Sequence, residues 1–584
     1  MIKIVIRVEG FVMKILWLTN VPAPYRVDFF NELGKFCDLT VIFEKKTSDE
    51  RDRSWLSYRT ENFRGIFLKG KSINTDSAIC FDVINYIKDK SYDEVVVTNI
   101  SSPTGIIAIS YMKMKGIEYW IEGDGGFAKY GNGLKNIVKK YLIKNAKGYF
   151  STSKEHDEYY LTYGAKRERI YRYPFTSIKQ EDIINADFLT NDDKKTLREQ
   201  LNMAEEYIIL SVGKLCCESD FELLMKVAEL LGNRYGFYFF NHEPTDKLVE
   251  RCKKNQLKNI HFINSLDKED LIEYYAASNS VILLNQMERD TVFYEAMLFG
   301  LPIITTAECI EGNRLDQDRI NIIFIEKDEE YDVFQKIKYL FEKEVDWKCS
   351  CADYNKLQMY TIDQMSPYSD ELIHVWQKKR AIIRKMARVR LEIPNNKKII
   401  LFVGQMIHRK GIDVLMECAV NLSRLNDDYF FLFVGGECPK ELEALYKLIP
   451  SDRIRFVTFL TSNELQYCYR AADIFCLLTR EDIWGLVINE AMSHFLPVIT
   501  TQYCIAGLEL VFEDLNGHVV SLENTEHICE HISNALLKKE EYGLESHRII
   551  SGYTIENMVQ RHIEVFSGCD CNSQINVKYQ CLEK

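Results

Sequence analysis

The feature that most constrains this fold is an internal repeat in the C-terminal two thirds of the chain. Three segments recur in the same order: residues 210–215 (LSVGKL) as 401–406 (LFVGQM), residues 294–306 (YEAMLFGLPIITT) as 489–501 (NEAMSHFLPVITT), and residues 360–365 (YTIDQM) as 553–558 (YTIENM). The starts of the paired segments lie 191, 195 and 193 residues apart. Offsets this constant indicate that a unit of about 190 residues, the size of a domain, is duplicated.

Both copies, and the segment before them, alternate short apolar runs with amphipathic helical stretches. The apolar runs are residues 398–404, 430–436, 454–459 and 474–478 in the second copy, and residues 14–19, 39–43, 94–98 and 118–121 before the repeats. This alternation is typical of parallel sheets covered by helices on both faces. The sequence therefore predicts an α/β protein with one N-terminal Rossmann-like domain and two related domains in tandem after it.

The predicted boundaries are an N-terminal domain of residues 1–185, a first repeat domain of residues 186–365 and a second of residues 366–566. Residues 567–584 carry no periodic pattern and are expected to form a tail. Residues 1–12 precede the first expected strand, and we expect them to be an extension from an upstream start codon.

Composition narrows the functional class. The chain has 584 residues, of which 46% are hydrophobic, and a formal net charge of −12. A general nucleic-acid-binding protein needs a basic face that replaces phosphate counterions, so this charge argues against nucleic acid as a partner. The 17 cysteines are scattered, and the pairs Cys349/Cys351 and Cys569/Cys571 lack the Cys-x2-Cys spacing of a zinc site. We therefore expect reduced thiols, no metal centre and a cytoplasmic protein, with no membrane-spanning helix because no apolar run reaches about 18 residues.

The end of the first strand in the second copy has the residues of an anion-binding loop. Gly404 closes the strand, Gln405 follows it, and Arg409 and Lys410 precede a helix that is expected to begin near Gly411. Ligands bind at the carboxyl ends of strands in open parallel sheets, and helix starts favour anions. Lys410 is therefore placed to meet a phosphate, although a Lys-Gly pair is also compatible with a solvated surface lysine.

A pair of carboxylates follows in the same copy. Asp482 lies in the loop after a strand and Glu490 inside the next helix, separated by seven residues. Gly485 permits close backbone approach, and the amides near Gly485 and Leu486 can hold a phosphate oxygen. Because a carboxylate accepts paired hydroxyls, one acid for a ribose and one for a sugar is reasonable chemistry. Acids near a helix start also serve as caps or solvated charges, and that alternative stays open.

At these residues the chain resembles glycosyltransferase family 4, a retaining group with two facing Rossmann-like domains, the GT-B fold. The segments that carry the resemblance are residues 404–415, 481–501 and 516–520. The resemblance implies transfer from a UDP- or GDP-linked sugar, with the departing phosphate accepting the proton of the acceptor. No metal and no cofactor besides this nucleotide-sugar donor are then expected, since a lysine and helix dipoles neutralise the leaving diphosphate.

The resemblance also implies roles for individual residues. Lys410, with Arg409 near it, would bind the diphosphate of the donor. Glu490 would bind the ribose, and Asp482 would bind a hydroxyl of the sugar. Two positions depart from the family pattern, because the family often has arginine where Gln405 stands and usually has glutamate where Asp482 stands.

The first copy departs much further from that pattern. Ser219 stands where the second copy has its lysine, Met287 where it has the loop carboxylate, and Asp290 where it has the glycine. Glu295 matches the helix carboxylate, and Lys214 lies in the place of the glutamine. We therefore expect a degenerate donor domain that keeps a structural role, the alternative being that Glu288, one position on, replaces the missing acid.

Two loops of the N-terminal domain are candidates for the acceptor side. Residues 20–30 (NVPAPYRVDFF) follow the first expected strand, and residues 122–126 (EGDGG) follow another. The family resemblance implies that this domain binds the acceptor. It makes Glu122 and Asp124 the catalytic candidates, near a strand end where many family members use a histidine. The glycines can equally form a tight turn with solvated acids.

Residues 134–150 (LKNIVKKYLIKNAKGYF) predict a basic amphipathic helix. Such a helix can lie on anionic lipid, which would make the protein peripheral at the inner face of a membrane. The alternative is an ordinary helix that packs on the sheet and turns a lysine-rich face to solvent.

The expected function is that of a hexosyltransferase in surface polysaccharide synthesis, with a glycan or lipid-linked acceptor. A degenerate copy separates the N-terminal domain from the intact donor domain. Either the N-terminal domain closes on the second copy, or another chain of a homo-oligomer or a partner glycosyltransferase supplies the acceptor domain. This gap keeps a second function open, that of a non-catalytic scaffold or partner subunit of another glycosyltransferase.

Overall fold

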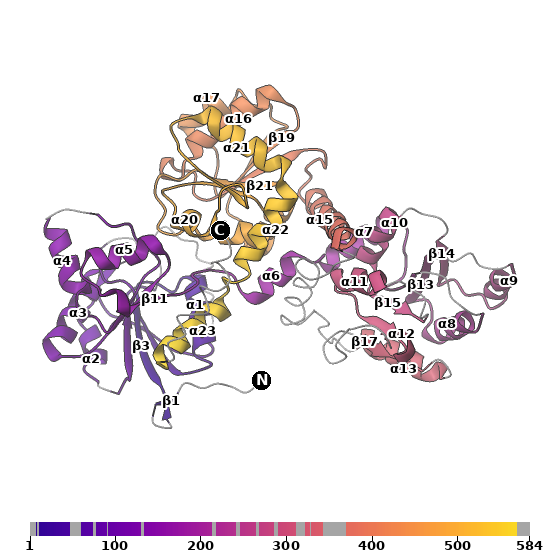
Figure 1. Ribbon diagram of the computed structural model, residues 1–584, viewed down its shortest axis with the longest axis horizontal. Coiled ribbons are helices and arrows are strands. Elements are labelled where there is room, and N and C mark those ends of the chain that lie inside the picture. Colours follow the sequence, from indigo (N-terminus) through magenta and orange to yellow (C-terminus); the bar gives the residue numbers. More distant parts are fainter. Residues whose placement is uncertain are drawn as a thin grey trace. The chain divides into compact units, whose positions relative to one another are not determined.

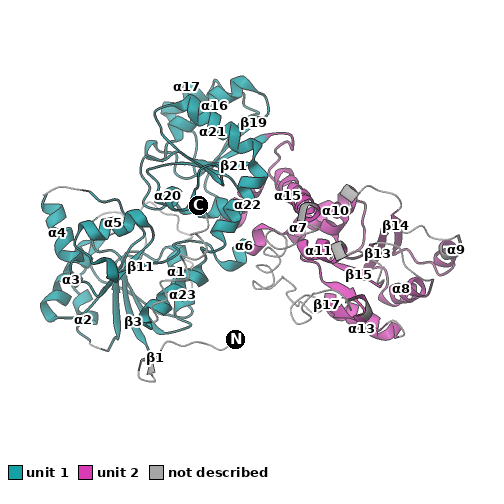
Figure 2. Ribbon diagram, in the orientation of Figure 1, with its two compact units in different colours: residues 1–183, 398–461, 472–584 teal, residues 184–397, 462–471 magenta. Residues whose placement is uncertain are grey.

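The computed structural model describes residues 7–8, 11–46, 60–73, 77–89, 91–129, 133–212, 218–240, 246–263, 268–284, 290–310, 322–326, 329–342 and 369–568. The chain forms two compact units (Figure 2). Unit 1 comprises Met1–Ile183, Lys398–Thr461 and Ala472–Lys584, and unit 2 comprises Ile184–Lys397 and Ser462–Ala471. The repeat segment 360–365, both Cys-x-Cys pairs and residues 569–584 of the expected tail lie outside the described residues.

The N-terminal part of unit 1 is a seven-stranded parallel sheet (Figure 1). Its strands, in the order in which they neighbour one another, are β11 (Ile170–Arg172), β10 (Gly148–Ser151), β9 (Trp120–Glu122), β8 (Glu94–Val97), β3 (Lys14–Thr19), β4 (Asp38–Phe43) and β5 (Arg64–Phe67). The helices between them include α1 (Pro24–Leu33), α2 (Val83–Ile87), α3 (Pro103–Lys115), α4 (Leu134–Ile143) and α5 (Lys154–Thr162). After an exposed first residue β3 and β4 are buried throughout, which explains their continuous apolar runs.

Two short antiparallel pairs accompany this sheet: β1 (Arg7–Val8) with β2 (Phe11–Val12), and β6 (Lys71–Ser72) with β7 (Ala78–Ile79).

Local sequence explains where α3 begins and ends. The Ser102 hydroxyl accepts a hydrogen bond from the Gly105 amide at 2.8 Å, Pro103 occupies the first turn, and Gly116 ends the helix with φ 65°. The same hydroxyl donates to the Glu44 carboxyl group at 2.6 Å. Since Glu44 directly follows β4, this contact ties the start of α3 to the carboxyl end of the sheet.

The second repeat contributes a six-stranded parallel sheet to the same unit. Its strands, in spatial order, are β20 (Ile454–Val457), β19 (Tyr429–Val434), β18 (Lys398–Val403), β21 (Ile474–Leu477), β22 (Val498–Thr501) and β23 (Gly517–Val520). The helices of this part are α16 (Ile412–Leu425), α17 (Glu443–Tyr446), α19 (Leu486–Ser493), α20 (Ile505–Leu510), α21 (Thr525–Leu537) and α22 (Lys539–Ile550). The apolar runs that the sequence predicted as strands coincide with β18 to β21.

The last helix, α23 (Ile555–Phe566), leaves the second repeat and packs on the N-terminal domain. The imidazole of His562 stacks on the ring of Phe150 with centroids 4.1 Å apart, and Arg561 Nε donates to the carbonyl oxygen of Arg172 at 3.1 Å. The N-terminal domain and the second repeat therefore belong to one unit. The N-terminal domain closes on the second copy, which was one of the two arrangements that the sequence left open.

Unit 2 holds the first repeat, and its sheet has the same order of strands as that of the second repeat. In spatial order the strands are β14 (Ile260–Ile263), β13 (Tyr235–Phe240), β12 (Tyr207–Val212), β15 (Ser280–Leu283), β16 (Ile303–Thr305) and β17 (Ile322–Phe324). The helix α6 (Gln180–Ala186) leads into this unit, and its other helices include α7 (Asn191–Gln200), α8 (Glu218–Leu231), α9 (Asp246–Lys254), α10 (Lys268–Ala277), α11 (Asp290–Leu298), α13 (Glu330–Glu342), α15 (Ser369–Arg390) and α18 (Ser462–Ala471).

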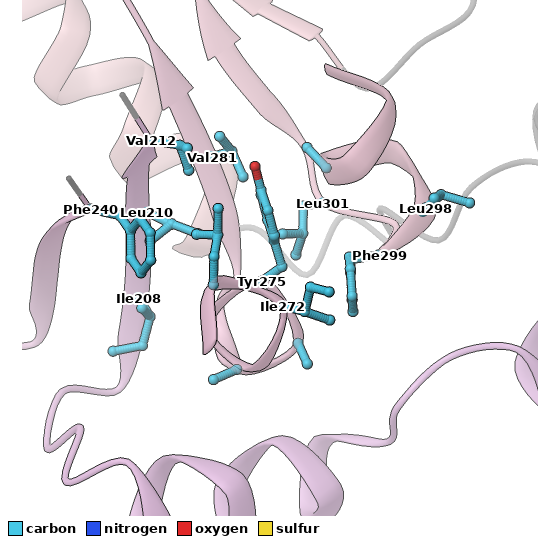
Figure 3. Close-up of a cluster of buried hydrophobic side chains, with 14 of the residues drawn as sticks. Ile208, Leu210, Val212, Phe240, Ile272, Tyr275, Val281, Leu298, Phe299 and Leu301 are labelled. Carbon is cyan, nitrogen blue, oxygen red and sulfur yellow. The ribbon is translucent and has the colours of Figure 1, made fainter. Parts of the chain in front are cut away.

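A hydrophobic core of unit 2 lies between its sheet and the helices α10, α11 and α15. Figure 3 shows Tyr275 of α10 among aliphatic side chains from β12 and β15, and its ring stacks on Phe299 with centroids 5.7 Å apart. The buried Arg470 of α18 also belongs to this unit, since its Nη2 donates to the Asn185 carbonyl oxygen at 2.7 Å. The predicted fold class, several α/β domains with parallel Rossmann-like sheets, is confirmed. Within the described part of the chain, no helix is long and apolar enough to cross a membrane.

Candidate functional site

The candidate site begins where β18 and β21 end. Gly404 follows β18, and a 3-10 turn, His408–Lys410, leads to Gly411 and then to α16. Gly411 has φ 72°, and a Cβ atom there would lie 1.7 Å from the carbonyl oxygen of Leu478 at the end of β21. Only glycine fits a backbone with this φ and this approach. The loop that presents Lys410 is thereby pressed against the loop that follows β21.

Arg480 locks these two loops together. Its guanidinium donates to the His408 carbonyl oxygen at 2.7 Å and to both carboxylate oxygens of Asp413 at 2.8 and 2.7 Å. Burial opposes ionisation of Asp413, but the hydrogen bonds and charge of Arg480 outweigh it and lower the pKa of that carboxyl. In return, the side chain of Arg409 donates to the Glu481 carbonyl oxygen at 2.9 Å. Arg480 was not predicted from the sequence, where its only signal is its position two residues before Asp482.

Lys410 and Asp482 form an ion pair at this junction. Their side chains are 16% and 15% exposed, so both charges are largely shielded while remaining open to a ligand. Asp482 is held by its backbone, because its amide donates to the Tyr503 carbonyl oxygen at 2.9 Å. The predicted phosphate-binding cation and the predicted sugar-binding acid therefore lie in direct contact.

The helix α19 starts immediately after this pair. Its first residue, Leu486, follows Gly485, which has φ 99° and offers no side chain to cap the first turn. A Cβ atom on Gly485 would lie 2.6 Å from Cys504 Sγ and 3.8 Å from Asp482 Oδ2. The first amides of a helix lack partners within the helix and favour an anion. In α19 the Ile488 amide already donates to the Gly485 carbonyl oxygen at 2.8 Å, so Leu486 and Val487 carry the amides that this argument uses. The start of α19 thus adds a second anion-binding element beside Lys410.

Glu490 lies in the second turn of α19 and is half-buried. It accepts a hydrogen bond from the Ser177 hydroxyl at 3.2 Å, and its neighbour Asn489 donates to the Phe175 carbonyl oxygen at 3.2 Å. Residues 173–179 follow β11 of the N-terminal sheet, so a segment from the other domain of unit 1 holds this helix. Ser177 was not predicted from the sequence, because 313 residues separate it from Glu490.

On the N-terminal side, Glu122 is fully buried at the end of β9. Its oxygens accept from Arg26 Nη1 at 2.7 Å, from the Tyr173 hydroxyl at 2.6 Å and from the Thr98 hydroxyl at 2.9 Å. With both oxygens bound inside the protein, this carboxylate is placed to orient Arg26. A role in direct contact with a substrate is not what this geometry favours.

Asp124 differs from Glu122, because its side chain is 36% exposed. It forms an ion pair with Arg26 and accepts a hydrogen bond from the Tyr25 hydroxyl at 3.0 Å. Burial and the neighbouring Glu122 raise the pKa of Asp124, while Arg26 acts in the opposite direction. Residues 20–30 and 122–126, the two loops predicted for the acceptor side, are therefore joined through these contacts.

The N-terminal and C-terminal halves of the candidate site meet within unit 1. Gly125 has φ 137°, and a Cβ atom there would lie 2.4 Å from the carbonyl oxygen of Ile483 and 3.0 Å from Ile505 Cδ1. Since Gly125 directly follows Asp124, and Ile483 directly follows Asp482, the two turns that carry these acids touch. Gln405 is exposed on the rim of the β18 loop. Among the described residues, no group of three or more His, Cys, Asp or Glu side chains is placed to hold a metal ion.

The corresponding region of the first repeat differs where it is described. Ser219 is exposed near the start of α8, and Glu295 is 3% exposed and accepts from the Tyr275 hydroxyl at 3.1 Å inside the core of unit 2. Lys214, Met287 and Glu288, and the side chain of Asp290, lie outside the described residues. The carboxylate that matches Glu490 is thus part of a core in this copy.

Comparison with known proteins adds a family match. The family model described as glycosyl transferases group 1 matches residues 193–353 and again residues 384–551. A D-inositol 3-phosphate glycosyltransferase of Salinispora tropica is 32% identical over 146 residues, which cover 23% of this chain and 30% of that protein. An uncharacterized glycosyltransferase of Haemophilus influenzae is 26% identical over 218 residues, covering 35% of this chain and 61% of that one.

Each of these matches spans less than two thirds of the relative's length. Among solved structures, the crystal structure of WaaG, a glycosyltransferase involved in lipopolysaccharide biosynthesis, aligns with 62% of this chain and all of that one, at 17% identity and a TM-score of 0.28.

Proposed function

This chain belongs to the glycosyl transferases group 1 family, and we propose that it is a retaining hexosyltransferase whose nucleotide-sugar donor is bound by the second repeat. The observation that carries this proposal is the ion pair between Lys410 and Asp482 beside the uncapped start of α19. A cation, an acid and a set of helix amides in one place match the phosphates and the sugar of a UDP- or GDP-linked donor.

The pair also suggests how the donor is received. In the free protein Asp482 neutralises Lys410, and the donor diphosphate takes its place on the lysine. Asp482 is then free to accept a hydrogen bond from a hydroxyl of the sugar, and Glu490 accepts hydrogen bonds from the ribose hydroxyls. As the bond to the sugar breaks, Lys410 and the dipole of α19 stabilise the charge on the leaving diphosphate, so the proposed reaction needs no metal.

We place the acceptor against Asp124. Its partly exposed carboxylate and the contact of Gly125 with Ile483 support this position. Arg26 and Glu122 are positioning residues in this scheme, because they hold Asp124 without facing solvent. The leaving phosphate takes the proton of the acceptor hydroxyl, and the acceptor itself is proposed to be a glycan or a lipid-linked sugar.

The first repeat is proposed to be a duplicated donor domain that has lost its donor. The same strand order in both sheets and the two matches to one family model support the duplication. The burial of Glu295 in a core supports a structural role for this copy. The chain would then be one glycosyltransferase made of its N-terminal domain and second repeat, with the sequence of an additional domain between them.

Release of sugar from a donor tests this function without knowledge of the acceptor. The full-length protein is incubated with UDP- and GDP-linked hexoses, and NMR follows the free sugar. We expect slow hydrolysis of one donor, and the sugar as first released should have the same anomeric configuration as in the donor. Lys410→Ala should abolish this hydrolysis. Lys398→Ala is the matched control, because Lys398 is a partly exposed lysine at the opposite end of β18, paired with Asp428 at 3.7 Å.

The other outcomes have defined meanings. A sugar released with the inverted configuration would contradict retaining transfer. Turnover that survives Lys410→Ala would contradict the assignment of the donor site. Absence of hydrolysis with every donor would contradict the enzyme proposal and favour the non-catalytic scaffold.

A further inference from the structure

The helix α4 exposes the apolar stripe that a surface helix ordinarily buries. Leu134, Ile137, Val138 and Tyr141 are 82%, 59%, 41% and 51% exposed. Their spacing of three, four and seven residues places them on one face of the helix. Figure 1 shows α4 beside α3 and α5 in the N-terminal domain.

The opposite side of the same helix supplies its contacts with the domain. Leu142 and Ile143 are buried in the core that also contains residues of α3 and β9. The exposed stripe is therefore not needed to attach α4. The alternative of an ordinary packed helix with only a lysine-rich outer face does not describe this element, because its outer face is apolar in the middle.

Lysines border the stripe on both sides. At 100° per residue, Lys135 lies next to Val138 on one side of the stripe and Lys140 lies next to Ile137 on the other. Lys113 at the end of α3 adds a further charge, because its Nζ donates to the Lys144 carbonyl oxygen at 2.6 Å and lies 4.9 Å from the centre of the Tyr141 ring. Met114, the next residue of α3, is also exposed.

The positive charge of this surface is concentrated. Burial, and after it the neighbouring Lys144, lowers the pKa of Lys113. Lys139 does not belong to this surface, because it lies on the inner side of α4 over the rings of Tyr159 and Tyr163. The chain as a whole carries a net charge of −12, so this cluster of lysines is a local feature, and such a cluster attracts an anionic surface.

We propose that α4 is a membrane-docking helix that lies flat on a bilayer containing anionic lipid. The stripe of Leu134, Ile137, Val138 and Tyr141 would enter the boundary between head groups and acyl chains, while the flanking lysines contact lipid phosphates. We favour a membrane over an apolar protein surface as the partner, because the positive charge of the lysines complements the negative charge of the lipid phosphates. The inference goes beyond the proposed transfer reaction and does not depend on it, because no residue of the donor site takes part.

Vesicle sedimentation of the full-length protein tests this inference. One set of vesicles contains phosphatidylcholine alone, and the other contains phosphatidylcholine and phosphatidylglycerol in equal parts. We expect binding to the second set, little binding to the first, and weaker binding as salt is raised. Leu134→Ser should weaken binding about tenfold, and Lys135→Gln with Lys140→Gln should weaken it by at least as much.

Leu425→Ser is the matched control, because Leu425 is a 76% exposed leucine at the end of α16, on the other domain of unit 1. It should bind vesicles like the unchanged protein. Equal binding to both vesicle types, binding that survives Leu134→Ser, or an equal loss in Leu425→Ser would each overturn the proposal. The protein could also fail to bind vesicles and instead self-associate in a way that Leu134→Ser abolishes. That result would overturn the proposal and assign the helix to contacts between copies of the chain.

Discussion

At the scale of the residue, the contact between Lys410 and Asp482 makes a prediction that a simple cation site would not. In the free protein Asp482 competes with any anion for the lysine, but it contributes a hydrogen bond once a sugar is present. The effect of removing its charge should therefore depend on whether the ligand carries a sugar.

Asp482→Asn should leave the affinity for free UDP or GDP unchanged or higher, because the competing carboxylate is gone. The same change should lower the affinity for the matching nucleotide sugar, so that the ratio of this affinity to that for the free nucleotide falls roughly tenfold. Calorimetric titrations of the free nucleotide and the nucleotide sugar measure both affinities. An equal loss for both ligands would show that Asp482 merely supports the loop.

A second prediction at this scale concerns Glu44, which is buried behind the carboxyl end of β4. Burial raises its pKa to about 7, against hydrogen bonds from Ser102 and the Ala78 amide that act to lower it. Because the pKa is higher in the folded state than in the unfolded state, the stabilisation is complete below about pH 4.5 and is lost as pH rises to about 7. The shift corresponds to about 3 kcal/mol.

Glu44→Gln removes this titration while keeping a polar side chain of similar size. Its melting temperature relative to that of the unchanged protein should therefore rise between pH 5 and pH 7.5 and level off above that range. Differential scanning fluorimetry of both proteins across this range measures the difference. A difference that does not vary with pH would show that Glu44 does not titrate as described.

At the scale of the element, α19 receives its orientation from outside its own domain. Ser177 and the Phe175 carbonyl group hold Glu490 and Asn489. If Glu490 binds the ribose, Ser177→Ala should weaken the binding of UDP or GDP about fivefold, which corresponds to the loss of one hydrogen bond. The affinity for inorganic pyrophosphate should not change, because it has no ribose. Competition binding measures both, with Ser177→Thr as the variant that restores the bond, and an equal effect on pyrophosphate would contradict the role.

Elements, their order and the sheet edge at which loops meet could be predicted from the sequence, whereas the side chains that hold those loops in place could not. The strands β3 and β18 begin where their apolar runs predicted, and Lys410 meets Asp482 because both follow strands that end at one edge of a sheet. Ser177 and Arg480 were missed, since a serine and an arginine in loops carry no periodic signal. The exposure of the α4 stripe was also beyond the sequence, because periodicity locates an apolar face but does not say whether the fold covers it.

At the scale of the whole molecule, the chain divides into two units, and the first repeat lies in unit 2. Lys379 on α15 is buried in that unit, where its ammonium group contacts Asp187 at 2.9 Å and the Leu298 carbonyl oxygen at 2.6 Å. Lys379→Met leaves Asp187 buried without this cation and should destabilise unit 2 by about 3–5 kcal/mol.

If the two units unfold separately, scanning calorimetry should show that Lys379→Met lowers one transition and leaves the other in place, with donor affinity unchanged. Lys385→Met, on the same helix but at a partly exposed ion pair with Glu273, should cost about 1 kcal/mol or less. A single transition that shifts as a whole would contradict the separation of the units.

The central claim, that the second repeat binds the donor of a glycosyltransferase, is tested most directly by isothermal titration of UDP and GDP into the full-length protein. We predict that one of them binds to the unchanged protein and to Lys398→Ala, and that Lys410→Ala weakens this binding by roughly a hundredfold, as the loss of a charge-assisted contact to phosphate requires. Binding that is equally tight in Lys410→Ala, or no binding of either nucleotide to the unchanged protein, would contradict the claim.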